Sequence, residues 1–440
     1  MKLSGWGRYP VHTTALCRPR TPEALQAELA DGPVIARGNG RAYGDSAVAQ
    51  GRTVQMRHFS HMISFDDATG VLVAEAGVLL GDVITAFLSR GWFPAVTPGT
   101  KFVTLGGMIA ADVHGKNHHK DGSFGSFVDW IELMGPDGVV KRCSPRRNKE
   151  LFEWTLGGMG LTGVILRAAI RLRPVESAWI RQTTRALPNL EAAIEAFEAA
   201  DEATYSVAWI DCLSKGDQLG RSLLMLGEHA AGDDLKKSRK KRPFEVPVKS
   251  KRTIPFDAPG LALNRFTVRA FNRLYYWNGT RKAGTTLVDW DSYFYPLDAI
   301  LGWNRIYGRR GFMQFQCALP LETSAEGLKA LLEATSAAGA GSFLAVLKRF
   351  GAQESRFSFP MAGYTLALDF PVNRTTLQLM ERLDAITLAH QGRFYLAKDS
   401  RMSAQTLRSS DTRVPDFEAM RAAGGLQARF HSKQSERLSL

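Results

Sequence analysis

Short apolar stretches and glycine-rich joints alternate along the first third of the chain. The pattern predicts a helix from about Thr21, a strand at 34–36, strands near Val54 and Val71, and a helix over 80–91. A further helix is predicted over 105–113, where paired glycines let small residues pack closely. This mixture of short strands and helices indicates an α+β domain.

The pattern changes after about Arg173-Pro174, where β-rich runs begin to alternate with alanine-rich helices. The predicted strands are 205–210, 311–319 and 364–370, and the predicted helices are 190–200, 325–338 and 377–390. Such a region is typical of an antiparallel sheet that helices cover on one face. The sequence therefore predicts a first domain at 1–176, a second at 177–391, and a C-terminal segment, 392–440, that returns to the first.

The composition is that of an ordinary globular protein. The 440 residues suffice for two or three domains, and 45% of them are hydrophobic. Cys17, Cys143, Cys212 and Cys317 form no C-x-x-C pair, which argues against a disulfide framework or a zinc knuckle and favours reduced thiols. The N-terminus lacks the apolar core of a signal peptide, and no window has the ~18 apolar residues of a transmembrane helix. We therefore expect a cytoplasmic protein.

The formal net charge of +13 favours an anionic partner. Much of the charge lies in two basic runs, 236–242 and 249–252, within a proline-rich segment. We expect residues 230–260 to form a mobile loop that does not pack. The loop can be merely solvated, it can anchor the protein to anionic lipid, or it can bind nucleic acid. Since no nucleic-acid motif accompanies it, we expect no nucleic-acid partner.

The next segment, residues 261–277, alternates aromatic side chains with Arg265, Arg269 and Arg273. It can lie in a membrane interface, or its aromatic residues can pack in the protein core. In the first case it would strengthen the lipid interpretation of the basic loop.

The run Arg37-Gly-Asn-Gly-Arg-Ala-Tyr-Gly-Asp45 is the clearest candidate for binding chemistry. Its three glycines can take positive φ and turn backbone N–H groups toward one point, as a diphosphate requires. The run is no Rossmann fingerprint, because Tyr43 stands at the sixth position and a strand follows in place of a long helix. We therefore expect a phosphate-binding turn in a different nucleotide-binding fold.

A second glycine cluster, Gly158-Met-Gly160-Leu-Thr-Gly163, matches G-x-G-x-x-G letter for letter. Its context is wrong, because a predicted helix at 149–156 precedes it and a β-rich stretch at 164–170 follows. We interpret it as a packing corner between a helix and a strand.

Two positively charged segments are candidates for catalysis. His114, His118 and His119 lack the carboxylates that would complete a metal shell, so we expect no metal. His114 and Lys116, at a helix end in a glycine-rich loop, suit a flavin ring and a substrate hydroxyl better. Lys398 is either an ordinary surface lysine or, because apolar residues precede it, a buried lysine with an anionic partner.

Gln314 and Gln316 stand two residues apart in a predicted strand, so both side chains point to one face. Two amides in a row are unusual for a core. They suit hydrogen bonding to a polyhydroxylated ligand.

Together these motifs resemble the decaprenylphosphoryl-β-D-ribose oxidase family of the vanillyl-alcohol oxidase superfamily. The motifs are the phosphate loop, Pro98-Gly-Thr100, Thr104-Leu-Gly-Gly107, His114-Gly-Lys-Asn-His-His119, Gly122-Ser-Phe-Gly125, Leu161-Thr-Gly163, Tyr293 to Asp298, Gly302-Trp-Asn-Arg305, Asp369-Phe-Pro371 and Ala397-Lys-Asp-Ser-Arg401. They follow one another in the family's order over nearly the whole chain. The resemblance implies an α+β enzyme of two domains, with FAD held by the first domain and the tail, and substrate under the second domain's sheet.

The resemblance also implies site residues. The FAD contacts that it implies are Arg37, Gly38, Asn39, Gly40, Arg41, Ala42, Tyr43, Gly44, Asp45, Ser46, Ala47, Gly99, Thr104, Leu105, Gly106, Gly107, Ala111, Asp112, Val113, His114, Ile165 and Tyr395. The catalytic candidates are Lys398, His114, Gln316 and Lys116, and the substrate contacts are Gln314, Gln316, Thr365 and Lys398. Relatives with covalent FAD carry a histidine in the phosphate loop, and since Tyr43 stands there we expect non-covalent FAD. Ala367 and Thr365 replace a cysteine and an asparagine of well-known members, so the pocket wall differs.

The activity implied is oxidation of a secondary alcohol: the 2′-hydroxyl of a polyprenyl-phosphate ribose becomes a ketone, as the first half of epimerisation to the arabinose form. An NAD(P)H-dependent reductase would be the partner for the second half, and the protein would be cytoplasmic or peripheral at the inner face of the membrane. We expect Lys398 to supply the cation beside the reduced flavin, and His114, which ordinarily titrates near neutrality, or Lys398 to be the base. The electron acceptor can be oxygen, a quinone or a protein.

Two other functions stay open at this point. One is a flavin enzyme for a soluble alditol or aldonolactone. The other is a basic module, not an enzyme, that holds a membrane or nucleic acid. A flavin spectrum of the purified protein would exclude the second.

Overall fold

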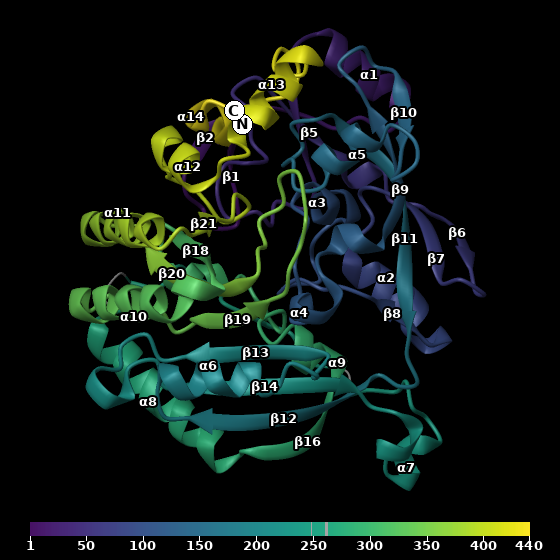
Figure 1. Cartoon of the computed structure of the whole chain (residues 1–440). Helices are drawn as coiled ribbons and strands as arrows, with labels where there is room; N and C mark the ends of the chain where they lie inside the picture. Colours follow the sequence, from purple (N-terminus) through teal and green to yellow (C-terminus); the bar gives the residue numbers. More distant parts are fainter. Residues whose placement is uncertain (248, 260–262) are drawn as a thin grey trace.

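The computed structural model describes residues 1–247, 249–259 and 263–440. Figure 1 shows the first domain and the C-terminal segment in the upper part of the molecule and the long strands of the second domain in the lower part. Both termini lie together at the top. The architecture is α+β, as the sequence predicts.

Two sheets form the first domain. Within the described residues its main sheet has six strands, in the order β10-β9-β11-β7-β6 with β8 also paired to β11. These strands are β6 (Met62–Asp66), β7 (Val71–Glu75), β8 (Trp92–Pro94), β9 (Val128–Met134), β10 (Val140–Cys143) and β11 (Val164–Pro174). A small parallel sheet of β3 (Ala15–Cys17), β5 (Arg52–Gln55) and β4 (Val34–Arg37) shares a core with β9 and β11.

Short helices connect these strands. They are α1 (Pro22–Ala30), α2 (Leu80–Phe87), α3 (Leu105–Ala110), α4 (His118–Asp121) and α5 (Lys149–Thr155). Thr21 caps α1 by accepting a hydrogen bond from Ala24 N, as its position predicts. Two predicted helices are too long: α2 gives way to a 3-10 turn that ends at Gly91 (φ 83°), and α3 ends at Ala110, after which Asp112 takes a positive φ of 36°. Positive φ breaks the helical repeat in both places.

The second domain is built on one long antiparallel sheet. Eight strands of the described chain pair in the order β16-β12-β14-β13-β19-β20-β18-β21. They are β12 (Trp179–Leu187), β13 (Tyr205–Ile210), β14 (Ser222–His229), β16 (Gly284–Asp289), β18 (Phe312–Pro320), β19 (Val346–Phe350), β20 (Gly363–Pro371) and β21 (Arg393–Phe394). The helices packed on it are α6 (Leu190–Glu198), α8 (Arg265–Arg281), α10 (Leu321–Ala338) and α11 (Arg374–Ala389).

Alternation along β18 explains why the helices cover only one face. Phe315 and Leu319 point into the core with Leu328 and Leu332 of α10. Gln314 and Gln316 therefore point to the opposite face, toward the first domain. The predicted sheet with helices on one side is confirmed.

The C-terminal segment joins the two domains. It begins with β21, which pairs with β18 and so extends the second domain's sheet beyond residue 391. Three helices follow: α12 (Ala404–Ser410), α13 (Val414–Ala423) and α14 (Lys433–Leu438). Ala397 O accepts a hydrogen bond from Tyr43 N, and Val34 forms a bridge with Phe430. The segment thus reaches the first domain only after it has closed the edge of the second sheet.

The basic segment 230–260 packs at several points, so the expectation that it does not pack is wrong there. Leu235 is buried against Trp179, Phe244 and Val246 contact core residues, and a helical turn, α7 (Lys237–Lys240), lies between them. Ala178 N donates a hydrogen bond to Pro243 O, which ties the segment to β12. Residues 248 and 260, and residues 261 and 262 of the aromatic segment, lie outside the described residues. Mobility of the loop stays a prediction.

Within the described ranges, no helix is both long enough and apolar enough to span a bilayer.

Candidate functional site

The candidate site lies where the polar face of the second sheet meets the first domain. Neighbouring strands place Gln314 opposite Asp369, Gln316 opposite Ala367, and Lys348 opposite Thr365. His114, from the turn after α3, reaches this face and contacts Gln316. Lys398, from the C-terminal segment, lies over the Tyr43 ring. Three segments far apart in sequence therefore converge here.

The phosphate loop follows β4 directly, and its backbone is held from several sides. Gln55 Nε2 donates to Gly38 O at 2.6 Å, and Asn39 Nδ2 donates to Phe102 O at 2.7 Å. Gly40 has a φ of 63°, a left-handed conformation that side chains disfavour. A Cβ on Gly44 would lie 2.1 Å from Asp399 O, so only glycine lets the C-terminal segment approach this closely. The glycines thus serve the turn and its contact with the tail.

The charged side chains of this loop divide into two kinds. Arg37 donates to Ser4 O and Ala47 O, and Asp45 pairs with Arg437, which also pairs with Asp399. These side chains are engaged in holding the protein together. Arg41 lies over the Trp6 ring at 4.2 Å, and its Nε is buried with no hydrogen-bond partner among the described residues. Arg41 is therefore the arginine of the loop with donor capacity to spare for a diphosphate.

The start of α3 abuts the phosphate loop. Thr104 caps the helix by accepting from Gly107 N at 3.3 Å, and its Oγ1 lies where a Cβ on Gly38 would be, 2.2 Å away. Gly106 packs on Ala76 with similar closeness, which a larger residue would prevent. The predicted cofactor residues of the loop and of 104–107 are thus brought together.

Other predicted cofactor residues lie deeper. The carboxylate of Asp112 accepts hydrogen bonds from Gly125 N, Gln353 Nε2 and Ser358 Oγ, so it positions this turn. Leu105, Val113 and Ile165 are buried in the first-domain core. Around Gly99 nothing lies within 4 Å of a built Cβ, so this turn has open space beside it.

His114 is buried between aromatic rings and stays neutral. Its Nε2 lies 3.1 Å from Gln316 Nε2, and its ring contacts Phe350 and Tyr395. Burial, followed by the charges of Lys348, His118 and Lys398, holds the pKa of His114 well below its usual value. Because Gln316 Nε2 is a donor, it donates to a neutral His114 Nε2, and the ring proton then sits on Nδ1. The ordinary pKa of a histidine, near neutrality, therefore does not apply to His114 in this site.

Lys398 is a strongly perturbed cation of the site. Its Nζ lies 3.7 Å from the centre of the Tyr43 ring. Burial lowers the pKa of Lys398 to about 7, Asp369 opposes this shift, and Lys348 adds to it. Gln314 Nε2 donates to Asp369 Oδ1 at 2.5 Å, and burial raises the pKa of this carboxyl. Lys398 is therefore buried near an anionic partner, as one of the two sequence interpretations proposed.

Two further lysines near the second sheet's polar side are buried. Lys116 donates to Tyr293 O and lies 4.1 Å from the centre of the Tyr293 ring, and burial lowers its pKa to about 7. Burial likewise lowers the pKa of Lys348, on β19, to about 8. Lys348 acts electrostatically on His114, Lys116 and Lys398. Sequence reasoning missed Lys348, although its alternation with buried Leu347 places it on the polar face.

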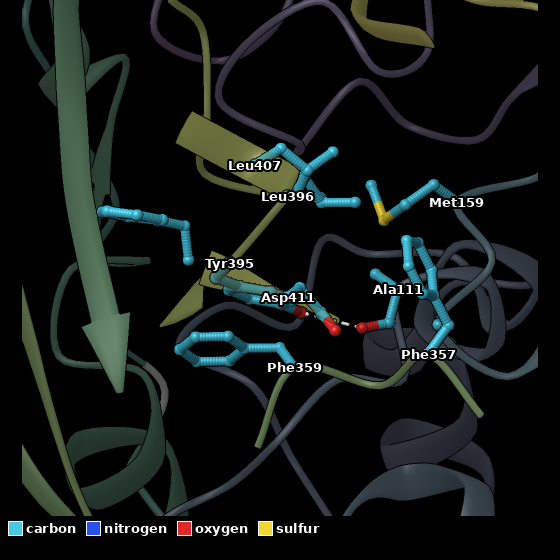
Figure 2. A pocket seen from close by; sticks show the side chains of 10 residues that line it. Ala111, Met159, Phe357, Phe359, Tyr395, Leu396, Leu407 and Asp411 are labelled. Atoms are coloured by element: carbon cyan, nitrogen blue, oxygen red, sulfur yellow. Dashed lines mark hydrogen bonds between the residues drawn. The ribbon is translucent and has the colours of Figure 1, made fainter. Parts of the chain in front are cut away.

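An aromatic wall closes the site on one side. Figure 2 shows Tyr395 and Phe359 lying parallel beside Ala111, with ring centres 4.7 Å apart. Tyr395 donates from its hydroxyl to Ala111 O at 3.1 Å, which ties the C-terminal segment to the end of α3. Met159 and Leu396 line the same pocket. The wall is built mostly of apolar and aromatic side chains, as a flat aromatic ligand requires.

The other two histidines of the motif are hydrogen-bonded to protein groups. His118 Nε2 contacts Gln353 Oε1 at 2.8 Å, and His119 Nε2 contacts Ala203 O at 2.7 Å.

The residues present fit FAD. The site combines a glycine loop with a spare arginine, an aromatic wall, and a polar sheet face. Arg41 Nε, His114 Nδ1 and Asp369 Oδ2 are buried there without hydrogen-bond partners in the part of the chain that the structure describes. Unpaired buried polar groups are costly, and a bound polar ligand would satisfy them.

Comparison with known proteins agrees with this geometry. A family model described as an FAD binding domain matches residues 13–144. That range holds the phosphate loop and 104–107, and it ends before the cluster at 158–163, which lies at the corner between α5 and β11. The packing interpretation of the second cluster is thereby favoured.

Relatives match over different lengths. Decaprenylphosphoryl-beta-D-ribose oxidase of Mycolicibacterium smegmatis is 35% identical over 100% of this chain and 97% of its own. An uncharacterized protein from the mprA 5' region of Streptomyces coelicolor is 31% identical over 80% of this chain and 97% of its own. Cytokinin dehydrogenase 9 of Oryza sativa subsp. japonica is 33% identical, over only 36% of this chain and 31% of its own.

Proposed function

The chain belongs to the decaprenylphosphoryl-β-D-ribose oxidase family and is an FAD-dependent oxidoreductase; from this premise we propose that it oxidises the 2′-hydroxyl of a polyprenyl-phosphate ribose to a ketone. The observation that supports the proposal is the buried Lys398, which interacts electrostatically with Asp369 of the amide-lined sheet face. FAD supplies the acceptor for the hydride that leaves the sugar carbon.

We assign proton removal to Lys398. A base must lose its own proton before it accepts one, and the lowered pKa of about 7 leaves about half of the Lys398 amines free at neutral pH. His114 is neutral as well, but its pKa lies well below its usual value and its Nε2 is engaged by Gln316. When Lys398 takes the hydroxyl proton it becomes an ammonium ion. The cation expected beside the reduced flavin thus arises in the same step.

The sheet face orients the sugar. Gln316 Nε2 is shared between His114 and Thr365 Oγ1, whose hydroxyl in turn donates to Cys317 O. Gln314 is fixed by Asp369. These amides are held in place by their partners, so they can hydrogen-bond sugar hydroxyls at little entropic cost. Thr365 and Ala367, which lie on the same sheet, determine the shape of this polar face.

Two wider roles belong to the same proposal. The ketone would pass to an NAD(P)H-dependent reductase that returns it as the arabinose form. The protein would work at the inner face of the membrane, because a polyprenyl tail stays in lipid.

The test is anaerobic bleaching of the bound flavin by a panel of alcohols. A short-chain polyprenyl-phosphate ribose should bleach the flavin, and the corresponding arabinose compound or a soluble alditol should not. Bleaching by the alditol alone would refute the assigned substrate class. A protein that purifies without flavin and cannot be loaded with it would refute the proposed flavin-dependent reaction.

A further inference from the structure

Helix α8 presents large apolar side chains to solvent. Phe266, Leu274 and Trp277 are 66%, 62% and 52% exposed, and Phe271 is 43% exposed. On a helix, positions 266, 270, 274 and 277 share one side. This outward stripe, Phe266, Ala270, Leu274 and Trp277, is here called the α8 stripe. Monomeric soluble proteins seldom expose such a row without a function.

The opposite side of α8 is packed against the protein, so the helix cannot rotate to bury its exposed residues without losing these contacts. Val268 and Asn272 are buried, and Asn272 Nδ2 donates to Asp211 Oδ1 at 2.8 Å. Tyr276 donates from its hydroxyl to Leu187 O, at the end of β12. Gly279 lies directly against Leu223. These contacts fix the helix with its apolar stripe facing away from the sheet.

The charged residues of α8 and of the chain on either side of it are all positive. Arg265, Arg269, Arg273, Arg281 and Lys282 are exposed, and the chain has no acidic residue between Asp257 and Asp289. No ion pair involving the four arginines is present in the described part of the chain. An apolar row flanked by unpaired arginines is complementary to a bilayer surface with anionic headgroups.

We propose that α8 is an interfacial helix that docks the protein on an anionic lipid surface, with Phe266, Leu274 and Trp277 inserted among the lipids. Arg269 and Arg273, which lie along one side of the stripe, hold the headgroups, and the helix lies in the membrane plane. Of the two segments that the sequence offers for a lipid contact, the basic run 236–242 and the aromatic segment 261–277, the proposal chooses the second, and there its helical part.

The two basic segments are separate in the structure. Arg239 stacks on Trp179 at the start of β12, whereas Tyr276 of α8 bonds Leu187 at its end. The strand between them spans roughly 25–30 Å at its usual rise. Figure 1 shows α7 and α8 at opposite ends of this sheet. Variants in either segment therefore test different surfaces.

A chain of aromatic rings leads from α8 to the candidate site. Phe271 contacts Phe343, which contacts Tyr307, and Tyr307 stacks on Phe312 with ring centres 4.4 Å apart. Phe312 contacts Tyr43, beneath Lys398. If the proposed function holds, a lipid-linked sugar held at Lys398 can have its apolar tail on the side of the molecule that α8 docks. The docking proposal itself does not depend on the substrate.

Sedimentation with vesicles tests the proposal on the full-length flavoprotein. The vesicles are phosphatidylcholine alone and phosphatidylcholine mixed with phosphatidylglycerol. The wild type should sediment with the mixed vesicles. Phe266→Ser/Leu274→Ser/Trp277→Ser should abolish sedimentation, and Arg269→Gln/Arg273→Gln should weaken it about thirtyfold on mixed vesicles, at ~1 kcal/mol for each arginine near the surface.

Matched controls separate the alternatives. Ile63 and Val140 are exposed apolar residues of the first domain, and Ile63→Ser/Val140→Ser should sediment like the wild type. Neutralising Lys236, Lys237, Arg239, Lys240, Lys241 and Arg242 should have less effect than Arg269→Gln/Arg273→Gln. If only the variant neutralised at 236–242 loses binding, the proposal is refuted. It is also refuted if the α8 stripe variant breaks a dimer and leaves vesicle binding unchanged.

Flavin absorbance and bleaching by a short-chain substrate give an independent readout. Both should be unchanged in the α8 variants, because α8 contributes no side chain to the candidate site. Loss of vesicle binding with intact bleaching supports the docking helix alone. Absent bleaching in the wild type would refute the proposed function while leaving the docking result to stand by itself.

Discussion

The base assigned to Lys398 can be tested through the pH dependence of flavin reduction. The rate of anaerobic flavin reduction should rise with pH through about 7 and then level off, because the free amine is the reactive form. At an ordinary lysine pKa of about 10.4, only about one amine in 2,500 would be free at pH 7. Burial therefore raises the reactive fraction about a thousandfold.

Two neighbours should move this profile in opposite directions. Asp369 raises the pKa of Lys398, so Asp369→Asn should shift the rising limb to lower pH. Lys348 lowers the pKa of Lys398, so Lys348→Met should shift the limb to higher pH. A purely structural role for either residue would change the amplitude of the rate without this pair of opposite shifts.

Replacement of Lys398 itself separates the base from a fixed cation. Lys398→Ala should keep its flavin spectrum and reduce its flavin at least about a hundredfold more slowly, since a general base contributes about that factor or more. Lys398→Arg should be as slow, because a guanidinium keeps its proton at any pH of the assay. Lys329→Ala, on the exposed side of α10, is the matched surface control.

The assay is stopped-flow absorbance of the flavin under anaerobic conditions, with a short-chain substrate, at pH values on both sides of about 7. Rescue by Lys398→Arg would show that a permanent cation suffices and would refute the base assignment. Shifts of Asp369→Asn and Lys348→Met in the same direction would refute the electrostatic reasoning. A wild-type rate in Lys398→Ala would remove the lysine from the reaction.

Three further predictions concern the phosphate loop and the cofactor that it is expected to hold. Gly40→Val should purify without flavin absorbance, because a β-branched residue is strained at the φ of 63°. Gly44→Ala should lower the free energy of unfolding by about 1–3 kcal/mol in thermal or denaturant unfolding, since its Cβ would lie 2.1 Å from Asp399 O, whereas Gly51→Ala, 3.5 Å from Pro33 O, should cost little. Acid precipitation should release the flavin into the supernatant, because the phosphate loop carries Tyr43 in place of a histidine; flavin that stays in the pellet would contradict this.

Local patterns predicted the fold where neighbours in sequence decide the structure. The alternation Gln314, Phe315, Gln316 correctly indicated which side chains face away from the core, because a strand repeats every two residues. The cap of α1 at Thr21 was equally local. Helix ends were less well predicted, since the positive φ of Asp112 is held by Gly125, Gln353 and Ser358 from distant segments.

The electrostatics of the site could not be predicted from local pattern. His114 and Lys116 were identified by the motif that carries them, but the low pKa of His114 depends on Phe350, Tyr395 and other groups from the second domain and the tail. Lys348 stands in an ordinary strand sequence, and only the pairing of β19 with β20 brings it to the polar face. The sequence prediction placed β21 in the C-terminal segment and not in the second domain's sheet. Its partner in that sheet, β18, is more than seventy residues away, so no local pattern shows the pairing.

These long-range contacts explain why the reactive amine depends on assembly of the whole molecule. Lys398 comes from the C-terminal segment, Asp369 and Lys348 from the second sheet, and Tyr43 from the first domain. Separated from these elements, Lys398 would be solvated and protonated at neutral pH, like any exposed lysine. The same burial that disfavours its charge also places it beside the polar sheet face. In this fold the lowered pKa of Lys398 is therefore produced by the meeting of the two domains, and contacts such as that between Gly44 and Asp399, which bring the tail against the phosphate loop, bear on this pKa as well as on stability.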